Sequence, residues 1–187
     1  LILDFFIFFF YFLGVYVSVD FAEKFPEILE SMTLFFSTTV ADDQEKKAIR
    51  RRSIAVIDEN FETFVKTSIP NLFSNNEKDI LEGKIELAKN IAKSTNKEGV
   101  KAAQLGMAER PDRTEILENL DAKILIIAGK YDNAVKTENL LKIIPEKTNI
   151  KTYVLDCGHN GHWEKPTICA EIINTELLHN LPKHFLL

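Results

Sequence analysis

Two titratable residues follow two short apolar runs near the C-terminal end of the chain. Ile124 to Ile127 is a continuous aliphatic run, and Asp132 lies a few residues beyond it. Tyr153 to Leu155 is the second run, and a glycine separates it from His159. A continuous aliphatic run between turn signals is typical of a strand that is buried on both faces of a parallel sheet. The pattern therefore predicts two buried strands, each followed by a side chain that can do acid–base chemistry.

The segment between the two runs is predicted to be a helix. Thr137 to Ile144 has helical spacing and Pro145 ends it, so the order is strand, helix, strand. The carboxyl ends of parallel strands meet at one edge of a sheet, which is where sites form. We therefore expect Asp132 and His159 to lie together. Such a histidine takes a proton from a hydroxyl and returns it to a leaving group, while the carboxylate orients the ring.

Other roles for these residues stay open. Asp132 could cap a loop, His159 could be a structural histidine, and His162 competes for the role of base. Glu164 is expected to interact with a helix dipole or to accept hydrogen bonds rather than to catalyse a reaction. His159 and His162 are three residues apart, but no third ligand is placed near them, so we expect no metal site. No cofactor motif occurs, and no cofactor is expected.

The composition of the 187 residues indicates a globular domain. Hydrophobic residues make up 45% and charged residues 27% of the chain, as in ordinary soluble proteins. The net charge of −5 and the lack of a dense basic stripe argue against binding to nucleic acid. Cys157 and Cys169 have neither metal-binding nor redox spacing, which favours a reducing compartment. We expect a cytoplasmic protein.

The N-terminal segment is almost wholly apolar through residue 19 and has three interpretations. A membrane-spanning helix needs about 20 apolar residues, and Asp4 interrupts this one. A signal peptide needs a positive N-terminal region, which is absent. The third interpretation, which we favour, is a buried strand over Leu3 to Phe10, a turn near Gly14 and a helix over Val15 to Lys24. The density of phenylalanine favours a strand.

The middle of the chain is predicted to be helical. The apolar period changes from two to 3.6 at Asp42, after a buried strand over Met32 to Phe36. Asp42 and Glu45 are predicted to form a capping box. The positive run in this helix is predicted to be a solvated face; it consists of Lys46, Lys47, Arg50, Arg51 and Arg52. We divide the chain into core (1–41), helical cap (42–115) and core (116–187).

A helical block between parallel strands, with an acid after one later strand and Gly-His after the next, resembles the α/β-hydrolase family, in particular its small capped esterases and lactonases. The matching segments are residues 14–26, 110–114, 126–132 and 157–166. The resemblance implies a partial α/β-hydrolase fold, N-terminally incomplete, with a mostly parallel sheet of about four strands and an inserted all-helical cap. It also implies a carboxylic-ester or similar acyl hydrolase that uses Asp132 and His159.

The chain departs from the family at the nucleophile. The family motif is G-x-S-x-G on a sharp turn between a strand and a helix. Aligning Gly14 with the last glycine places Phe10 at the first glycine and Phe12 at the serine. Phenylalanine has no nucleophilic atom, and it resists the backbone angles of the turn. We therefore expect an inactive or impaired enzyme, in which the backbone N–H of Leu13 could supply only half of an oxyanion hole.

The expected ligand is a small apolar ester-like molecule, and membrane attachment is not expected. The resemblance implies that the strand from Phe5 to Phe12 is an exposed edge, which predicts self-association. One alternative is an active enzyme with an unusual nucleophile or with water activated directly by His159. The other is a non-catalytic binding protein that keeps the capped pocket and is tethered to a membrane by its N-terminus.

Overall fold

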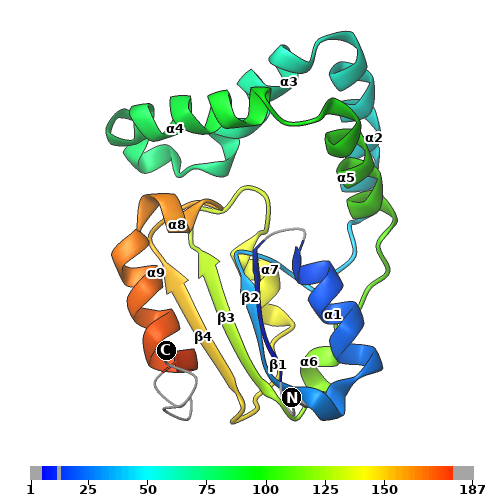
Figure 1. Cartoon of the computed structure of the whole chain (residues 1–187), viewed down its shortest axis with the longest axis vertical. Coiled ribbons are helices and arrows are strands. Elements are labelled where there is room, and N and C mark those ends of the chain that lie inside the picture. The colour runs from blue at the N-terminus through cyan, green and yellow to red at the C-terminus, as the bar shows by residue number, and fades with distance from the viewer. Residues whose placement is uncertain (1–5, 12–13, 179–187) are drawn as a thin grey trace, which may run out of the picture.

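The structure is a computed structural model, and it describes residues 6–11 and 14–178. Its centre is a four-stranded sheet in the order β1-β2-β3-β4, in which all neighbouring strands are parallel (Figure 1). The strands are β1 (Phe6–Tyr11), β2 (Leu29–Phe35), β3 (Lys123–Gly129) and β4 (Ile150–Leu155). The prediction of a mostly parallel sheet of about four strands is confirmed.

The helices fall into three groups along the chain. After β1 comes α1 (Gly14–Lys24). Between β2 and β3 lie α2 (Gln44–Glu59), α3 (Phe61–Ser68), α4 (Lys78–Lys93), α5 (Lys97–Glu109) and the short α6 (Ile116–Asn119). The last group is α7 (Thr137–Lys142), α8 (Gly161–Glu164) and α9 (Pro166–Ile173). Short 3-10 turns span Pro26–Ile28, Ile69–Leu72 and Asn75–Glu77, and a π turn spans Asn174–Leu178.

Several predicted boundaries are wrong by a few residues. β2 begins at Leu29 rather than at Met32, because it pairs with β1 from its first residue. Phe36 lies beyond β2 with a φ of 49°, in the left-handed region that side chains other than glycine rarely adopt. α7 ends at Lys142, two residues before the predicted end, and Ile143 is its C-cap. Of the predicted strand Leu3 to Phe10, residues 3–5 lie outside the described residues.

The predicted capping box at the start of α2 is also wrong. Asp43 is the N-cap, and its side chain accepts a 2.7 Å hydrogen bond from the backbone N–H of Lys46. Asp42 instead turns inward and is buried. Asn96 is the N-cap of α5, since its side chain accepts hydrogen bonds from the backbone N–H groups of Glu98 and Gly99.

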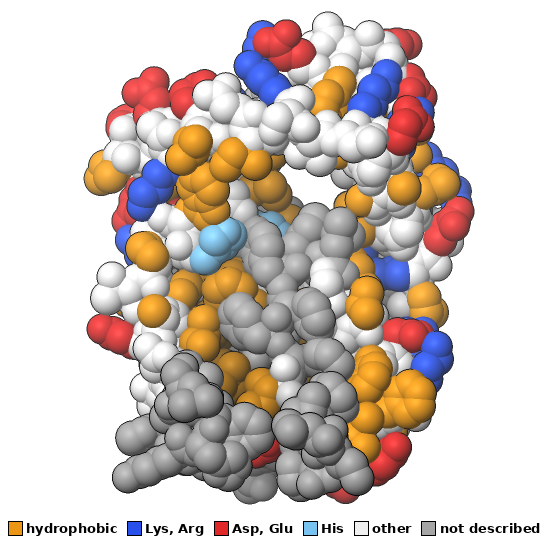
Figure 2. Space-filling view, in the orientation of Figure 1, with side chains coloured by type: hydrophobic (Ala, Val, Ile, Leu, Met, Phe, Trp, Pro, Cys, Tyr) orange, Lys and Arg blue, Asp and Glu red, His pale blue; other side chains and the backbone are white. Residues whose placement is uncertain are grey.

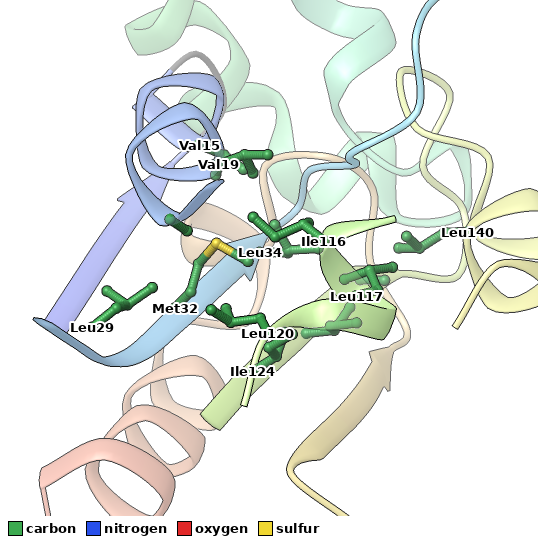
Figure 3. Packing of buried hydrophobic residues seen from close by; sticks show 13 residues of the cluster. Val15, Val19, Leu29, Met32, Leu34, Ile116, Leu117, Leu120, Ile124 and Leu140 are labelled. Carbon is green, nitrogen blue, oxygen red and sulfur yellow. The ribbon is translucent and has the colours of Figure 1, made fainter. Parts of the chain in front are cut away.

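Two apolar clusters hold helices to the two faces of the sheet. The first packs α1, α6 and α7 against β2 and β3 (Figure 3). Its fully buried members include Val15 from α1, Leu117 from α6 and Ile124 from β3. Burying a side chain of this size stabilises the fold by about 1.5–3 kcal/mol. This cluster therefore fixes the sheet relative to three helices that are far apart in the sequence.

The second cluster packs the C-terminal helix against the opposite face. It includes Leu125 and Ile127 from β3, Cys157 after β4, and Cys169 and Ile172 from α9. Both cysteines are free and buried. Burial raises the pKa of the Cys169 thiol to about 11, so this thiol is protonated at neutral pH. The two cysteines act here as small apolar side chains.

The helices from α2 to α5 form a block above the carboxyl ends of the strands (Figure 1). Phe73, Leu81 and Ile85 make a small apolar core within it, against which Trp163 of α8 packs. The ammonium of Lys84 in α4 donates to the carbonyl of Trp163 at 2.6 Å. The helical block is therefore anchored directly above the end of β4. The division of the chain at residues 41 and 115 stays a prediction.

Two predictions concern the N-terminal segment. In the described part of the chain, β1 has one neighbouring strand, β2, and it lies at an edge of the sheet. Self-association through this edge stays a prediction. Of the helices in the described ranges, none is long and apolar enough to cross a membrane.

Candidate active site

The carboxylate of Asp132 is held where the chain turns after β3. Its Oδ1 atom accepts hydrogen bonds from the backbone N–H groups of Ala134 at 2.7 Å and Val135 at 2.8 Å. Its own N–H donates to the carbonyl of Gly129. Asp132 is only 4% exposed, and a buried carboxylate needs such donors to offset the loss of water. The turn therefore fixes both the position and the orientation of the carboxylate.

His159 lies after β4 and meets this carboxylate. Its Nδ1 atom is 2.8 Å from Oδ2 of Asp132, and each side chain is 1% exposed. The ionised carboxylate can only accept, so we assign Nδ1 as the donor. In an acid–base pair of this kind, Nε2 is the atom that exchanges a proton with the reactants. The structure thus brings together the two residues that the sequence predicts, and their catalytic role stays a prediction.

The loop that carries Asp132 and the loop that carries His159 are in direct backbone contact. The N–H of Lys130 donates to the carbonyl of Leu155, and the N–H of Tyr131 donates to that of Cys157. A Cβ atom added to Gly129 would lie 2.2 Å from the carbonyl oxygen of Gly158. Only glycine leaves room for the two loops to approach this closely.

Glu164 holds the histidine loop from the other side. Its carboxylate accepts hydrogen bonds from the N–H of Gly158 at 2.9 Å and from the N–H of Ser74 at 3.3 Å. Glu164 is therefore a hydrogen-bond acceptor, one of the two roles predicted for it. Because Ser74 belongs to the helical block, Glu164 also ties this block to the histidine loop. Burial raises the pKa of Glu164.

His162 is not the residue that meets Asp132. It lies in α8, one turn beyond His159, and Phe35 is next to it with ring centres 6.1 Å apart. Burial lowers the pKa of His162, and the neighbouring His159 lowers it further. Among the described residues, no group of three or more acidic, histidine or cysteine side chains could hold a metal ion.

Phe12 and Leu13 lie outside the described residues. The assignment of Phe12 to the nucleophile position and of the Leu13 N–H to the oxyanion hole therefore stays a prediction. Ser18 is described, and it lies in α1 with its hydroxyl donating to the carbonyl of Gly14 at 3.1 Å. It is buried and satisfied within its own helix.

A cavity of about 440 Å³ lies between the helical block and the core. Figure 2 shows this face of the molecule hollowed below the block. Most of its lining is apolar and includes Phe64, Ile69, Leu72 and Met107. The cavity reaches the loop of Asp132 at Ala134 and Val135, while Asp132 and His159 are not among its described lining residues. Its size is that of a small-molecule site.

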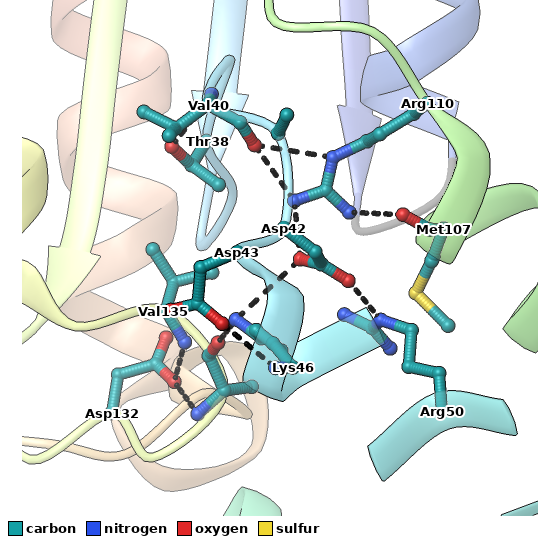
Figure 4. Close-up of polar contacts among 12 residues, drawn as sticks. Thr38, Val40, Asp42, Asp43, Lys46, Arg50, Met107, Arg110, Asp132 and Val135 are labelled. Atoms are coloured by element: carbon teal, nitrogen blue, oxygen red, sulfur yellow. Dashed lines mark hydrogen bonds and ion pairs between the residues drawn. The ribbon is translucent and has the colours of Figure 1, made fainter. Parts of the chain in front are cut away.

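A second buried carboxylate lies beside this cavity, and the sequence interpretation missed it. The side chain of Asp42 is fully buried and accepts hydrogen bonds from Arg50 Nε and from Arg110 Nη2, the latter at 2.9 Å (Figure 4). Lys46 Nζ is 3.8 Å from Asp42 and donates to the carbonyl of Ala134 at 2.6 Å. Part of the predicted solvated face is therefore an interior ion-pair cluster, because the partner arginine comes from the end of α5.

The spacing of Asp42, Lys46 and Arg50 could have indicated part of this cluster. Residues four apart share one face of a helix, so a charged stripe with an acid at its start indicates a paired face. The sequence gives no comparable sign that Arg110 completes the cluster. Its guanidinium also lies 4.5 Å from the ring centre of Tyr16, and burial raises the pKa of that tyrosine.

We predict that Gly129→Ala lowers the free energy of unfolding by about 2–3 kcal/mol, because its methyl group would overlap the backbone of the histidine loop. Gly83→Ala is the matched control in α4, where an added Cβ meets no atom within 4 Å. It should raise stability by up to about 1 kcal/mol. Urea unfolding followed by circular dichroism measures both. Equal effects of the two substitutions would contradict the close approach of the loops.

The pH dependence of stability tests the burial of Glu164. Its pKa is raised above the ordinary value of 4.5, so between the two values the folded protein binds a proton that the unfolded chain has lost. This contribution is fully present below about 4.5 and is lost as pH rises through the folded-state pKa. Relative to Glu164→Gln, the wild type should therefore lose stability from pH 4 to 7. Glu171→Gln changes an exposed residue and is the control, so its stability should depend on pH as that of the wild type does. If the stability of Glu164→Gln also runs parallel to that of the wild type, the burial is refuted.

Comparisons with known proteins support the architecture. No protein family model and no curated protein sequence match the chain. Solved structures do: an esterase from Thermogutta terrifontis with malate bound is 30% identical, with a TM-score of 0.78 over 90% of this chain and 63% of that one. An enol-lactonase from Burkholderia xenovorans LB400 is 15% identical, with a TM-score of 0.78 over 90% and 64%. A hydrolase from Pseudomonas aeruginosa PA01 is 19% identical, with a TM-score of 0.75 over 88% and 62%.

The chain thus spans less than two thirds of the length of each of these three proteins. Within that span, the parallel strand order and the helices that connect the strands agree with the α/β-hydrolase fold. Over the part that it spans, the chain has the α/β-hydrolase fold.

Proposed function

We propose that Asp132 and His159 are the acid and base of an acyl-hydrolase site for carboxylic esters or lactones. We further propose that Phe12 leaves the chain unable to turn such substrates over. The site then retains two of the three members of a nucleophile–base–acid triad. A small ester-like molecule would occupy the cavity below the helical block.

One observation carries this proposal: the 2.8 Å contact between His159 Nδ1 and Asp132 Oδ2, excluded from water. A carboxylate in this position selects the ring tautomer and stabilises the imidazolium that forms when Nε2 takes a proton. The order along the chain, acid before histidine, is that of α/β-hydrolases. The similarity to an esterase and to an enol-lactonase supports an acyl group as the target.

The chemistry explains why Phe12 would stop turnover. Acyl transfer through a triad begins with attack by a hydroxyl whose proton passes to the histidine. A phenyl ring supplies neither the attacking atom nor the proton. Water would then be the only nucleophile that His159 could activate.

A second candidate function is non-catalytic ligand binding, and the cavity favours it. A volume of about 440 Å³ with a mostly apolar lining accommodates a small molecule whether or not a nucleophile is present. Loss of the nucleophile would not affect such binding.

Hydrolysis of p-nitrophenyl butyrate by engineered variants tests the proposal. The wild type should show no hydrolysis above buffer. Phe10→Gly combined with Phe12→Ser restores the small residue and the hydroxyl of the motif, and it should hydrolyse the ester. Adding His159→Ala should then lower the rate by about 100-fold or more, the usual contribution of a general base.

Phe10→Gly combined with Phe12→Ala is the matched control, since it removes the same bulk without adding a nucleophile, and it should remain inactive. Hydrolysis by the wild type that His159→Ala abolishes would contradict the proposed loss of activity. Hydrolysis by the serine variant that survives His159→Ala would contradict the role of His159.

A further inference from the structure

The charged side chains among the described residues that line the cavity are all positive. Lys46, Arg50 and Arg110 line it together, and none of the described residues that line it is acidic. Three cations beside an apolar cavity are costly unless they are paired, because desolvation disfavours the charged form. The arrangement therefore requires negative charge nearby.

Asp42 supplies only part of that charge. Its buried carboxylate is not among the lining residues of the cavity, and it pairs with Arg50 through Oδ2 and with Arg110 through Oδ1. Asp42 pairs with the three cations and the more distant carboxylate of Asp132 also acts on Lys46, so two carboxylates face three cations and leave a formal excess of one positive charge. The side chains of Arg50 and Arg110 are 14% and 8% exposed and that of Lys46 is 35% exposed, so water offsets the charge mainly at Lys46.

The three cations differ in how many of their hydrogen-bond donors already bond to the protein. Arg110 is engaged by the protein: its three nitrogens donate to the carbonyls of Val40 and Met107 and to Asp42. A guanidinium has five N–H groups. Within the described ranges, Arg50 uses two of them, toward Asp42 and, at 3.4 Å, toward Gln104. Its other three donors make no hydrogen bond to a described residue, and we assign them to a ligand.

Lys46 is in a similar position at the edge of the cavity. Its ammonium donates to the carbonyl of Ala134 and lies 3.8 Å from Asp42, beyond hydrogen-bond distance. Burial lowers the pKa of Lys46 and the charges of Arg50 and Arg110 lower it further, against the opposing effect of Asp42 and Asp132. An anion in the cavity would counter both effects. Because Ala134 belongs to the turn that holds Asp132, this anion would lie beside the candidate catalytic loop.

We propose that the cavity selects small apolar ligands that carry a carboxylate, which Arg50 and Lys46 bind. The planar fork of a guanidinium matches a carboxylate, and the apolar lining surrounds the rest of the molecule. This inference rests on the proposed function, since it names the substrate class of that pocket: an ester or lactone that bears an additional carboxylate.

Binding of three matched probes to the full-length chain tests the inference without any need for catalysis. Octanoate, 1-octanol and octylamine share one apolar chain and differ in charge. Isothermal titration calorimetry should show octanoate binding at least about tenfold more tightly than octanol, as expected for hydrogen bonds to charged groups. Octylamine should bind most weakly of the three.

Arg50→Gln should reduce the affinity for octanoate by about tenfold and leave that for octanol unchanged. Arg51→Gln is the matched control, because Arg51 is the next residue of α2 and is exposed. It should change neither affinity. Thermal unfolding of both variants checks that they fold. If Arg50→Gln does not fold, the order of the three affinities for the wild type still tests the inference.

Equal binding of octanoate and octanol would overturn the charge preference, and so would failure of all three probes to bind. Tighter binding of octyl phosphate than of octanoate would overturn the choice of a carboxylate. These outcomes are distinct from failure of the proposed function, which is read from hydrolysis and its dependence on His159.

Discussion

Asp132 is a carboxylate that is almost completely removed from water, and much of the structure serves to hold it. Two backbone N–H groups donate to one of its oxygens, and His159 meets the other. The N–H groups come from the turn that carries Asp132 itself, but His159 reaches it only because β3 and β4 end side by side and Gly129 lets the two loops touch. The sheet, the two turns and the histidine loop are therefore linked through the need to satisfy one buried charge.

The same constraint organises the boundary between the helical block and the core. Asp42 is fully buried, and it joins the start of α2 to Arg110 at the end of α5. Lys46 continues this network to Ala134, whose N–H donates to Asp132. Two buried carboxylates are thus connected through one lysine and one turn. The cavity lies along this connection, which gives the helical block a direct physical link to the candidate site.

Much of the sheet could be predicted because aliphatic runs such as Ile124 to Ile127 have few alternatives in a chain of this composition. The approach of Asp132 to His159 could also be predicted, since the carboxyl ends of adjacent parallel strands meet at one edge. The cluster around Asp42 could not, because Arg110 is 68 residues away and its contact depends on tertiary packing. The loop contact at Gly129 could not be predicted for the same reason. The sequence indicates that the strand ends at this glycine, but it does not show which part of the chain packs against it.

The candidate site depends most directly on the hydrogen bond between His159 and Asp132, and nuclear magnetic resonance of ¹⁵N-histidine-labelled protein measures it. We expect the His159 ring to be protonated at Nδ1, with the proton shifted to low field by the carboxylate and protected from exchange. Asp132→Asn should remove the low-field shift and permit the other tautomer. A His159 signal that shows Nδ1 without a proton, or that is unchanged by Asp132→Asn, would contradict the account.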